Sequence, residues 1–243
     1  HSANNEFADS SSTAPEWNGL SAKGRALVAE ANRLGIVLDQ SHASDTVFDQ
    51  LLELSKAPII LTHTSADEVY EHMRNIDDAR IRRLAENGGL LQVNAYGSYL
   101  KNTNMTAEYR TALRALTERF YGVVTGSREY DQFIAQKLAL DEQFNVAPAS
   151  FDDYMRHVLH IIRVAGTEHV GFGADWDGGG GVAGLEDVSM LPKITARLLQ
   201  EGFTEAQITA MWGGNMLRVI GDAQRVAQEL AAAATVAEAP VAQ

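Results

Sequence analysis

The sequence contains no cysteine, and this absence limits both its covalent and its metal chemistry. Without thiols there is no disulfide framework and no thiolate metal site, so any bound metal must be held by histidine and carboxylate side chains. The absence fits a reducing cytoplasm as well as an oxidising periplasm or extracellular space, so it leaves the compartment open. Since no apolar run approaches the roughly 18 residues of a membrane span, we expect a soluble protein.

Basic residues are scarce relative to acidic ones. Lys and Arg number 20 against 32 Asp and Glu, which gives a formal net charge of −12. This balance argues against nucleic acid or an anionic membrane surface as the main partner. Hydrophobic residues make up 45% of the 243 residues, which excludes disorder throughout the chain. We expect one domain over residues 1–230 and an Ala-rich, disordered tail over 231–243.

Short apolar runs alternate with stretches of helical periodicity. A first helix is expected from about Ser21 to Gly35, with Leu27, Ala31 and Leu34 recurring at helical spacing. Further helices are expected from about residue 44, over 77–85, and through a long, mostly helical middle at 106–165. Between them lie four apolar runs, at 36–38, 58–61, 90–93 and 169–174, and each is followed by polar residues. This alternation predicts the buried strands of a parallel α/β sheet.

The polar residues that end these runs are Asp39 with His42, His63, Asn94 and Asp175. In a (β/α)8 barrel the chemistry lies at the C-terminal ends of the strands, and in a doubly wound open sheet ligands bind at the same edge. A closed barrel of this type needs eight strands, and we find four convincing ones. Either the long middle contains further strands, which its composition does not favour, or this chain is the C-terminal portion of a larger enzyme. We favour the second interpretation.

His42 and His63 are the strongest candidates for metal ligands. Each follows an apolar strand, and a single helix separates the two strands. Because adjacent strands lie about 4.8 Å apart, imidazoles at neighbouring strand ends can reach one Zn²⁺ at about 2.0–2.1 Å. The alternative, a hydrogen bond from each ring to a loop, is favoured for either histidine alone but not for the matched pair. Two histidines do not fill a site, so further ligands are required.

Asp175 and Arg74 are candidates for catalysis and substrate binding. Asp175 lies in the glycine-rich stretch 171–179, where a carboxylate can ligate a metal or take a proton from metal-bound water. The alternative is a turn in which Asp175 and Asp177 cap loop amides. Arg74 follows the His63 strand and can grip a substrate carboxylate with two hydrogen bonds. A solvated salt bridge with Asp77 or Asp78 is an equally good interpretation of Arg74.

Seven short segments of the sequence carry a resemblance to a known family. They are LDQSHAS (38–44), APIILTHTSA (57–66), HMRNIDD (72–78), NGGLLQVN (87–94), HVGFGADWDGG (169–179), GLEDVSMLP (184–192) and GGNMLRVI (213–220). Because they occur in the same order, the chain resembles the membrane (renal) dipeptidase family of zinc metallopeptidases over nearly its whole length. This resemblance implies a (β/α)8 barrel with two bridged Zn²⁺ ions that hydrolyses dipeptides, and it implies that this chain supplies about the last half to two-thirds of the barrel.

The resemblance also implies individual roles. His42 and His63 match the family's pair of His ligands on one zinc, and Asp175 matches its active-site aspartate. Arg74 matches the arginine that binds the terminal carboxylate of the substrate. His1 resembles a histidine that contacts the substrate and stabilises the tetrahedral intermediate, although the first residue of a chain is ordinarily disordered.

One departure from the family pattern concerns the remaining zinc ligands. The family's His-x-Asp pair and bridging Glu lie upstream of the position that matches His1, so neither is in this sequence. We therefore expect a missing N-terminal segment of the same enzyme as a partner, besides the dipeptide substrate. A homo-oligomer is possible, and no nucleic acid is expected.

Two other functions remain open at this stage. A related binuclear amidohydrolase would act on a lactone or a phosphotriester, and its substrate would need no free carboxylate to meet Arg74. An inactive fragment could serve as a scaffold or subunit, and it would purify without stoichiometric zinc.

Overall fold

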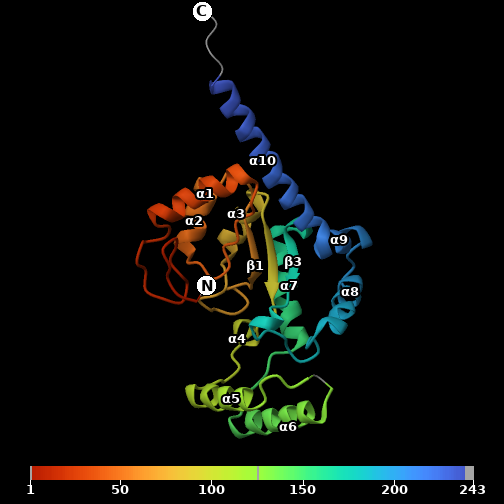
Figure 1. Ribbon diagram of the computed structural model, residues 1–243. Helices are drawn as coiled ribbons and strands as arrows, with labels where there is room; N and C mark the ends of the chain where they lie inside the picture. The colour runs from red at the N-terminus through yellow and green to blue at the C-terminus, as the bar shows by residue number, and fades with distance from the viewer. Residues whose placement is uncertain (1, 125, 239–243) are drawn as a thin grey trace, which may run out of the picture.

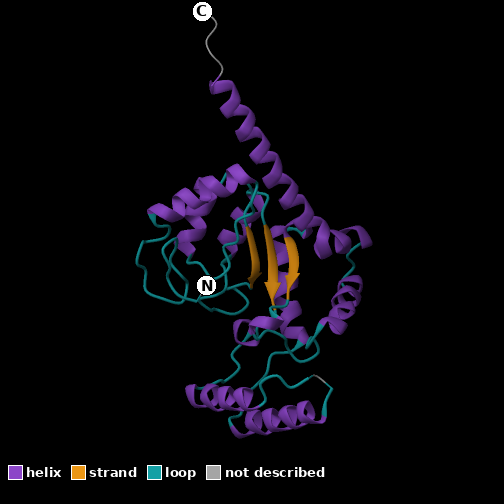
Figure 2. Ribbon diagram, in the orientation of Figure 1, coloured by secondary structure: helices purple, strands orange, loops and turns teal. Residues whose placement is uncertain are grey.

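A three-stranded parallel sheet forms the centre of the molecule (Figure 2). The computed structural model describes residues 2–124 and 126–238. Strands β1 (Ile60–Thr64), β2 (Leu90–Asn94) and β3 (Val170–Gly173) lie side by side in chain order. In the register, Leu91 of β2 pairs with Leu61 of β1 and with Val170 of β3, and these three side chains are fully buried. They belong to the main hydrophobic core, as the apolar runs predict.

The first predicted strand, at 36–38, is reduced to a single parallel bridge between Asp39 and Ile60. The backbone amides of Gln40 and Ile60 still donate to Ile60 O and Leu38 O, each over 2.9 Å. Ile36, at the start of the run, is 53% exposed, so this segment lacks the burial that the other strands have. Of the four predicted strands, three therefore form, and the prediction of a strand at 36–38 is corrected to this bridge.

The N-terminal part of the chain contains three amphipathic helices: α1 (Ala22–Leu34), α2 (Asp45–Leu54) and α3 (Asp78–Glu86). Each begins at a side chain that accepts a backbone N–H of its first turn, namely Ser21, Ser44 and Asp77. The buried face of α1 differs from the expectation, because Val28 and Ala31 are buried whereas Leu27 and Leu34 are exposed.

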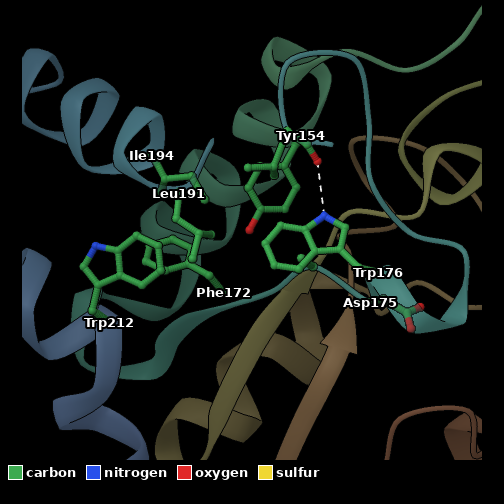
Figure 3. Close-up of a pocket in the computed structure, with 9 residues that line it drawn as sticks. Tyr154, Phe172, Asp175, Trp176, Leu191, Ile194 and Trp212 are labelled. Atoms are coloured by element: carbon green, nitrogen blue, oxygen red, sulfur yellow. Dashed lines mark hydrogen bonds between the residues drawn. The ribbon is translucent and has the colours of Figure 1, made fainter. Parts of the chain in front are cut away.

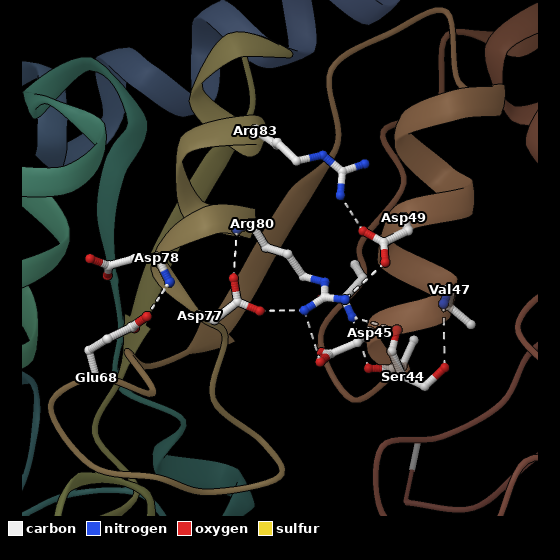
Figure 4. Close-up of polar contacts among 11 residues, drawn as sticks. Ser44, Asp45, Val47, Asp49, Glu68, Asp77, Asp78, Arg80 and Arg83 are labelled. Carbon is white, nitrogen blue, oxygen red and sulfur yellow. Dashed lines mark hydrogen bonds and ion pairs between the residues drawn. The ribbon is translucent and has the colours of Figure 1, made fainter.

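A charge network joins α2 to α3 (Figure 4). The guanidinium of Arg80 contacts Asp45 at 3.2 Å, Asp49 at 2.9 Å and the helix-capping Asp77, and Arg83 adds a second contact to Asp49. Arg80 is only partly exposed, so this network is screened less than an isolated surface pair. It fixes the helix that follows the His42 loop against the helix that follows the Arg74 loop.

The long helical middle is divided rather than continuous. It consists of α5 (Ala107–Arg119), α6 (Arg128–Gln143) and α7 (Phe151–Ala165), and the short helix α4 (Gly97–Leu100) precedes it. Helices α5 and α6 form a hairpin that projects away from the sheet, whereas α7 packs on it (Figure 1). A single amphipathic stripe buries Met155, Val158 and Ile161 of α7 in the main core.

The C-terminal part contains α8 (Leu191–Gln200), α9 (Glu205–Thr209) and α10 (Asn215–Glu238), with a π-helical turn at Ala210–Gly214. Short 3-10 turns occupy Thr167–His169, Trp176–Gly178 and Val188–Met190. Helix α10 packs on α1 and then extends beyond it (Figure 1). Helix α10 ends at Glu238, within the region 231–243 for which the sequence predicts disorder. Residues 239–243 lie outside the described residues, and the disorder of this tail stays a prediction. None of the described helices has the length and hydropathy of a membrane span.

Candidate metal and substrate site

The carboxyl ends of the three strands converge on Asn94. This buried amide closes β2, and its Nδ2 donates to the carbonyl of His63 on β1 and to Oδ2 of Asp175 after β3, each over 3.2 Å. Its own Oδ1 accepts the backbone N–H of Tyr96. The polar residues that follow the apolar runs therefore meet at one edge of the sheet, as parallel strands require.

His42 and His63 lie side by side at this edge. Their ring centroids are 4.8 Å apart and the ring planes are inclined by 58°. His42 adopts the left-handed backbone conformation, with φ of 74°, which is uncommon for a residue other than glycine. The neighbouring Ser41 hydroxyl accepts the backbone N–H of His63 over 3.1 Å and so links the two segments.

Both imidazoles are held in the neutral state. Burial, followed by the positive charge of Arg74, lowers the pKa of His42 to about 4. Burial also lowers the pKa of His63, although the carboxylates of Asp175 and Asp39 act in the opposite direction. Neutral imidazole is the form that binds metal ions, so both rings carry a lone pair at neutral pH.

Arg74 is buried beside this pair, with 5% of its surface exposed. Its Nη2 donates to the carbonyl of His63 over 3.4 Å, and its guanidinium lies 5.5 Å from the centre of the Tyr99 ring. Within the described residues it forms no ion pair, and its buried Nε lacks a hydrogen-bond partner. Asp77 and Asp78 pair instead with Arg80 and Arg82, so the solvated salt bridge considered for Arg74 is not formed.

The glycine-rich segment folds tightly around Asp175, which itself has φ of 59°. A Cβ at Gly180 would lie 2.2 Å from the carbonyl oxygen of Ala174, so this position accepts only glycine. The carboxylate accepts the amide of Asn94 rather than capping amides of its own loop. The turn-capping alternative for Asp175 therefore does not describe its side chain.

An apolar cavity of about 170 Å³ lies next to this segment (Figure 3). Phe172, Trp176 and Trp212 supply aromatic walls, and Trp176 Nε1 donates to Leu185 O over 3.3 Å. The Asp175 carboxylate points away from the aromatic walls of this cavity (Figure 3), and its Oδ2 accepts the amide of Asn94.

The two imidazoles fit one ligand pair of a Zn²⁺ site, but the described residues supply no third His or carboxylate atom close to both. The group of such atoms that does lie within 4.8 Å of one another is elsewhere, in Glu68, Asp78 and His160. There, His160 Nε2 is 2.6 Å from Asp78 Oδ1, and Arg82 pairs with the same carboxylate. These contacts account for the cluster without an ion.

The remaining histidines have structural contacts. The Nδ1 of His157 accepts the Ala66 N–H over 3.1 Å, and its Nε2 is 3.0 Å from Leu100 O, as expected for a packing residue. His169 is half-buried, and its Nδ1 is 2.9 Å from Gly89 O. His1, for which the resemblance implies a role, lies outside the described residues.

Two contacts of the site were not found from the sequence. Tyr99 lies against Arg74, and Thr62 contacts His63 through its hydroxyl. The signal available for Thr62 was its place directly before His63, which Ser41 repeats before His42. For Tyr99, the helix that carries it toward the site is only four residues long and gives no periodic pattern.

The chain matches, over residues 1–234, the family described as membrane dipeptidase (peptidase family M19), and it belongs to that family. Dipeptidase aclJ of Aspergillus oryzae is 32% identical over 95% of this chain and 46% of its own length. The probable dipeptidase PvdM of Pseudomonas aeruginosa has a TM-score of 0.74 at 28% identity, covering 93% of this chain and 62% of its own.

A metallo peptidase of Rhodobacter sphaeroides, solved with a phosphinate mimic of the dipeptide L-Ala-D-Ala, has a TM-score of 0.64 at 27% identity. That match covers 89% of this chain and 50% of the other. The chain spans less than half the length of the curated relatives that it matches. Membership of the family implies metal dependence.

Proposed function

We propose that the protein containing this chain is a zinc-dependent dipeptidase that hydrolyses the peptide bond of dipeptides. The observation that carries the proposal is a buried guanidinium without a carboxylate partner next to two neutral imidazoles at one sheet edge. A dipeptide has a free carboxylate close to its scissile bond. The guanidinium can bind the carboxylate, and the imidazoles can hold a metal ion at the scissile bond. Family membership supports the same reaction.

The proposed architecture is a (β/α)8 barrel completed by an N-terminal segment outside this sequence. The strands follow one another in chain order without the reversal that defines a doubly wound sheet. The sheet is also strongly curved, because a Cβ at Gly173 on β3 would lie 2.1 Å from the carbonyl oxygen of Thr62 on β1, two strands away. Such approach of alternate strands is typical of barrel interiors.

In this proposal, His42 and His63 hold one of two zinc ions, and the missing segment supplies the other ligands. Zinc, when bound, lowers the pKa of water so that hydroxide is available at neutral pH, and it polarises carbonyl groups. Arg74 binds the terminal carboxylate and thereby orients the substrate. Asp175, held by Asn94, accepts a proton and delivers it to the leaving amine. We keep His1 as a proposed contact to the tetrahedral intermediate.

The binuclear hydrolase of lactones or phosphotriesters is less well supported. A substrate without a free carboxylate would leave the Arg74 guanidinium buried and unpaired, which is costly. An inactive scaffold has no need of two histidine rings brought together at one sheet edge beside a buried arginine.

The test compares a dipeptide with its C-terminal amide in the full-length, zinc-loaded protein, using L-Ala-D-Ala and L-Ala-L-Ala as probes. Arg74→Ala should lower kcat/KM for the dipeptide by about 10²–10³-fold, because it removes a charge-assisted bidentate contact of a few kcal/mol. The amide should already be poor for the wild type and should change little on substitution.

Arg82→Ala is the matched control, since it removes an exposed guanidinium paired with Asp78 and should leave kcat/KM unchanged. An equal loss for dipeptide and amide would contradict carboxylate binding by Arg74. Failure of the wild-type protein to cleave any dipeptide would reject the proposed function as a whole.

A further inference from the structure

The hydroxyl of Thr62 lies between the carboxylate of Asp39 and the ring of His63. Thr62 Oγ1 is 2.6 Å from Asp39 Oδ2 and 2.8 Å from His63 Nδ1. The three residues come from the bridge segment and from β1, which are joined by the Asp39–Ile60 pairing. The chain carboxylate–hydroxyl–imidazole is therefore built into the backbone pairing at the sheet edge.

The number of protons determines the direction of both hydrogen bonds. An ionised carboxylate only accepts, and a threonine hydroxyl has one hydrogen to donate. Thr62 therefore donates to Asp39, over a distance typical of a charge-assisted bond. Its oxygen is left as an acceptor for His63, so Nδ1 of that ring must carry the hydrogen. A neutral imidazole with its hydrogen on Nδ1 has its lone pair on Nε2.

Backbone contacts hold the Asp39 carboxylate in this orientation. Its other oxygen, Oδ1, accepts the N–H groups of Ser41 and of Thr62, over 3.0 and 3.2 Å. Both donors are amides whose hydrogens cannot move, so Oδ1 is committed to them and Oδ2 is directed at the hydroxyl. We call the hydrogen-bonded chain Asp39–Thr62–His63 the relay. Its direction is set by two fixed backbone dipoles rather than by a mobile side chain.

We propose that Asp39 and Thr62 are positioning residues that fix His63 as the Nδ1–H tautomer and present its Nε2 as a metal ligand. The inference deepens the proposed function and rests on it for the metal, whereas the tautomer is a property of the metal-free protein. Partners of this kind, which hold the second nitrogen of a ligating imidazole, typically contribute 10–100-fold in metal affinity.

Asp39→Asn gives the sharpest test because it should reverse the relay. The amide oxygen would take the place of Oδ1 against the two backbone N–H groups, and the amide nitrogen would then donate to Thr62. The hydroxyl would turn toward His63 Nδ1 and force the hydrogen onto Nε2. Long-range ¹H–¹⁵N correlation spectra of full-length, metal-free protein should show Nδ1–H in the wild type and Nε2–H in Asp39→Asn.

Thr62→Val and Thr62→Ser provide a second measurement that does not depend on the asparagine. Thr62→Val keeps the shape of the side chain but removes the hydroxyl, so the ring should lose its single tautomer, and zinc should bind 10–100-fold more weakly in chelator competition. Thr62→Ser should restore both. Thr64→Val, on the other side of His63 in the same strand, should keep the wild-type tautomer and zinc affinity.

The outcomes separate the two proposals. A wild-type ring with Nε2–H, or an unchanged Nδ1–H tautomer in Asp39→Asn and in Thr62→Val, would overturn the relay whatever the zinc affinity. A wild-type protein that shows Nδ1–H and the predicted reversal but binds no zinc would support the relay and reject the proposed metal function.

Discussion

The sheet edge and the α5–α6 hairpin are built on different principles. At the sheet edge, residues from three separate strands contact one another through Asn94, and the side chains beneath them are fully buried. The hairpin packs mainly on itself, through a hydrogen bond from Tyr109 to Asp141 and contact of Phe120 with Phe133. Its tip exposes 92% of Tyr121.

This difference indicates where coupling is strong. Long-range contacts at the sheet edge mean that one side chain affects several segments, whereas a contact inside the hairpin affects mainly the hairpin. Substitutions at the sheet edge should therefore change chemistry or global stability, and those in the hairpin should change local opening. The following predictions test this contrast.

The largest effect is expected for Asp175→Asn. Asparagine tolerates the left-handed backbone at this position, and its oxygen can still accept the Asn94 amide, so the fold should be kept. Loss of the basic carboxylate should lower turnover by about 10²–10⁴-fold. Steady-state kinetics of the zinc-loaded, full-length protein measure this loss, and thermal unfolding serves as the control. Turnover close to that of the wild type would remove Asp175 from the proposed proton transfer.

An intermediate effect is expected from the buried His157, whose side chain is 0% exposed. Burial lowers its pKa from 6.5 to about 4 in the folded chain, so between these values the unfolded chain binds more protons. The contribution of neutral His157 to the free energy of unfolding is therefore complete above about pH 6.5. It is lost as the pH falls toward 4, by up to about 3 kcal/mol.

His157→Gln removes this titration while keeping a donor for Leu100 O and an acceptor for the Ala66 N–H. Urea unfolding between pH 4 and 8 should give a steeper decline of the free energy of unfolding for the wild type than for the variant. Parallel curves would show that His157 does not titrate between the two states.

The sequence identified the elements that periodicity or burial alone determines. β1, β2 and β3 follow from their apolar runs, and Ser21, Ser44 and Asp77 mark helix starts. Gly35 in the left-handed conformation ends α1 where expected. The division of the helical middle was not predicted, although Gly122 and Gly126 before α6 and Pro148 before α7 are residues that interrupt helices.

The candidate site also combines features that the sequence predicts with features that it does not. The meeting of His42 with His63 follows from parallel pairing, so it could be expected from strand order. The burial of Arg74 and the relay through Thr62 depend on side-chain packing and on hydrogen-bond direction, which a single sequence does not encode in any local pattern. Metal and substrate roles at these positions remain predictions.

The smallest effect is expected in the hairpin, for Tyr109→Phe. The substitution removes the hydroxyl that donates to Oδ1 of Asp141, and Lys137 remains as a partner of that carboxylate over 2.8 Å. The cost should be about 1 kcal/mol, confined to local opening of the hairpin. Amide hydrogen exchange over 107–143 should accelerate about fivefold, while exchange in β1, β2 and β3 and the turnover of the zinc-loaded protein stay unchanged. Faster exchange in the strands as well would show that hairpin and sheet open together, and the contrast between the two regions would then be wrong.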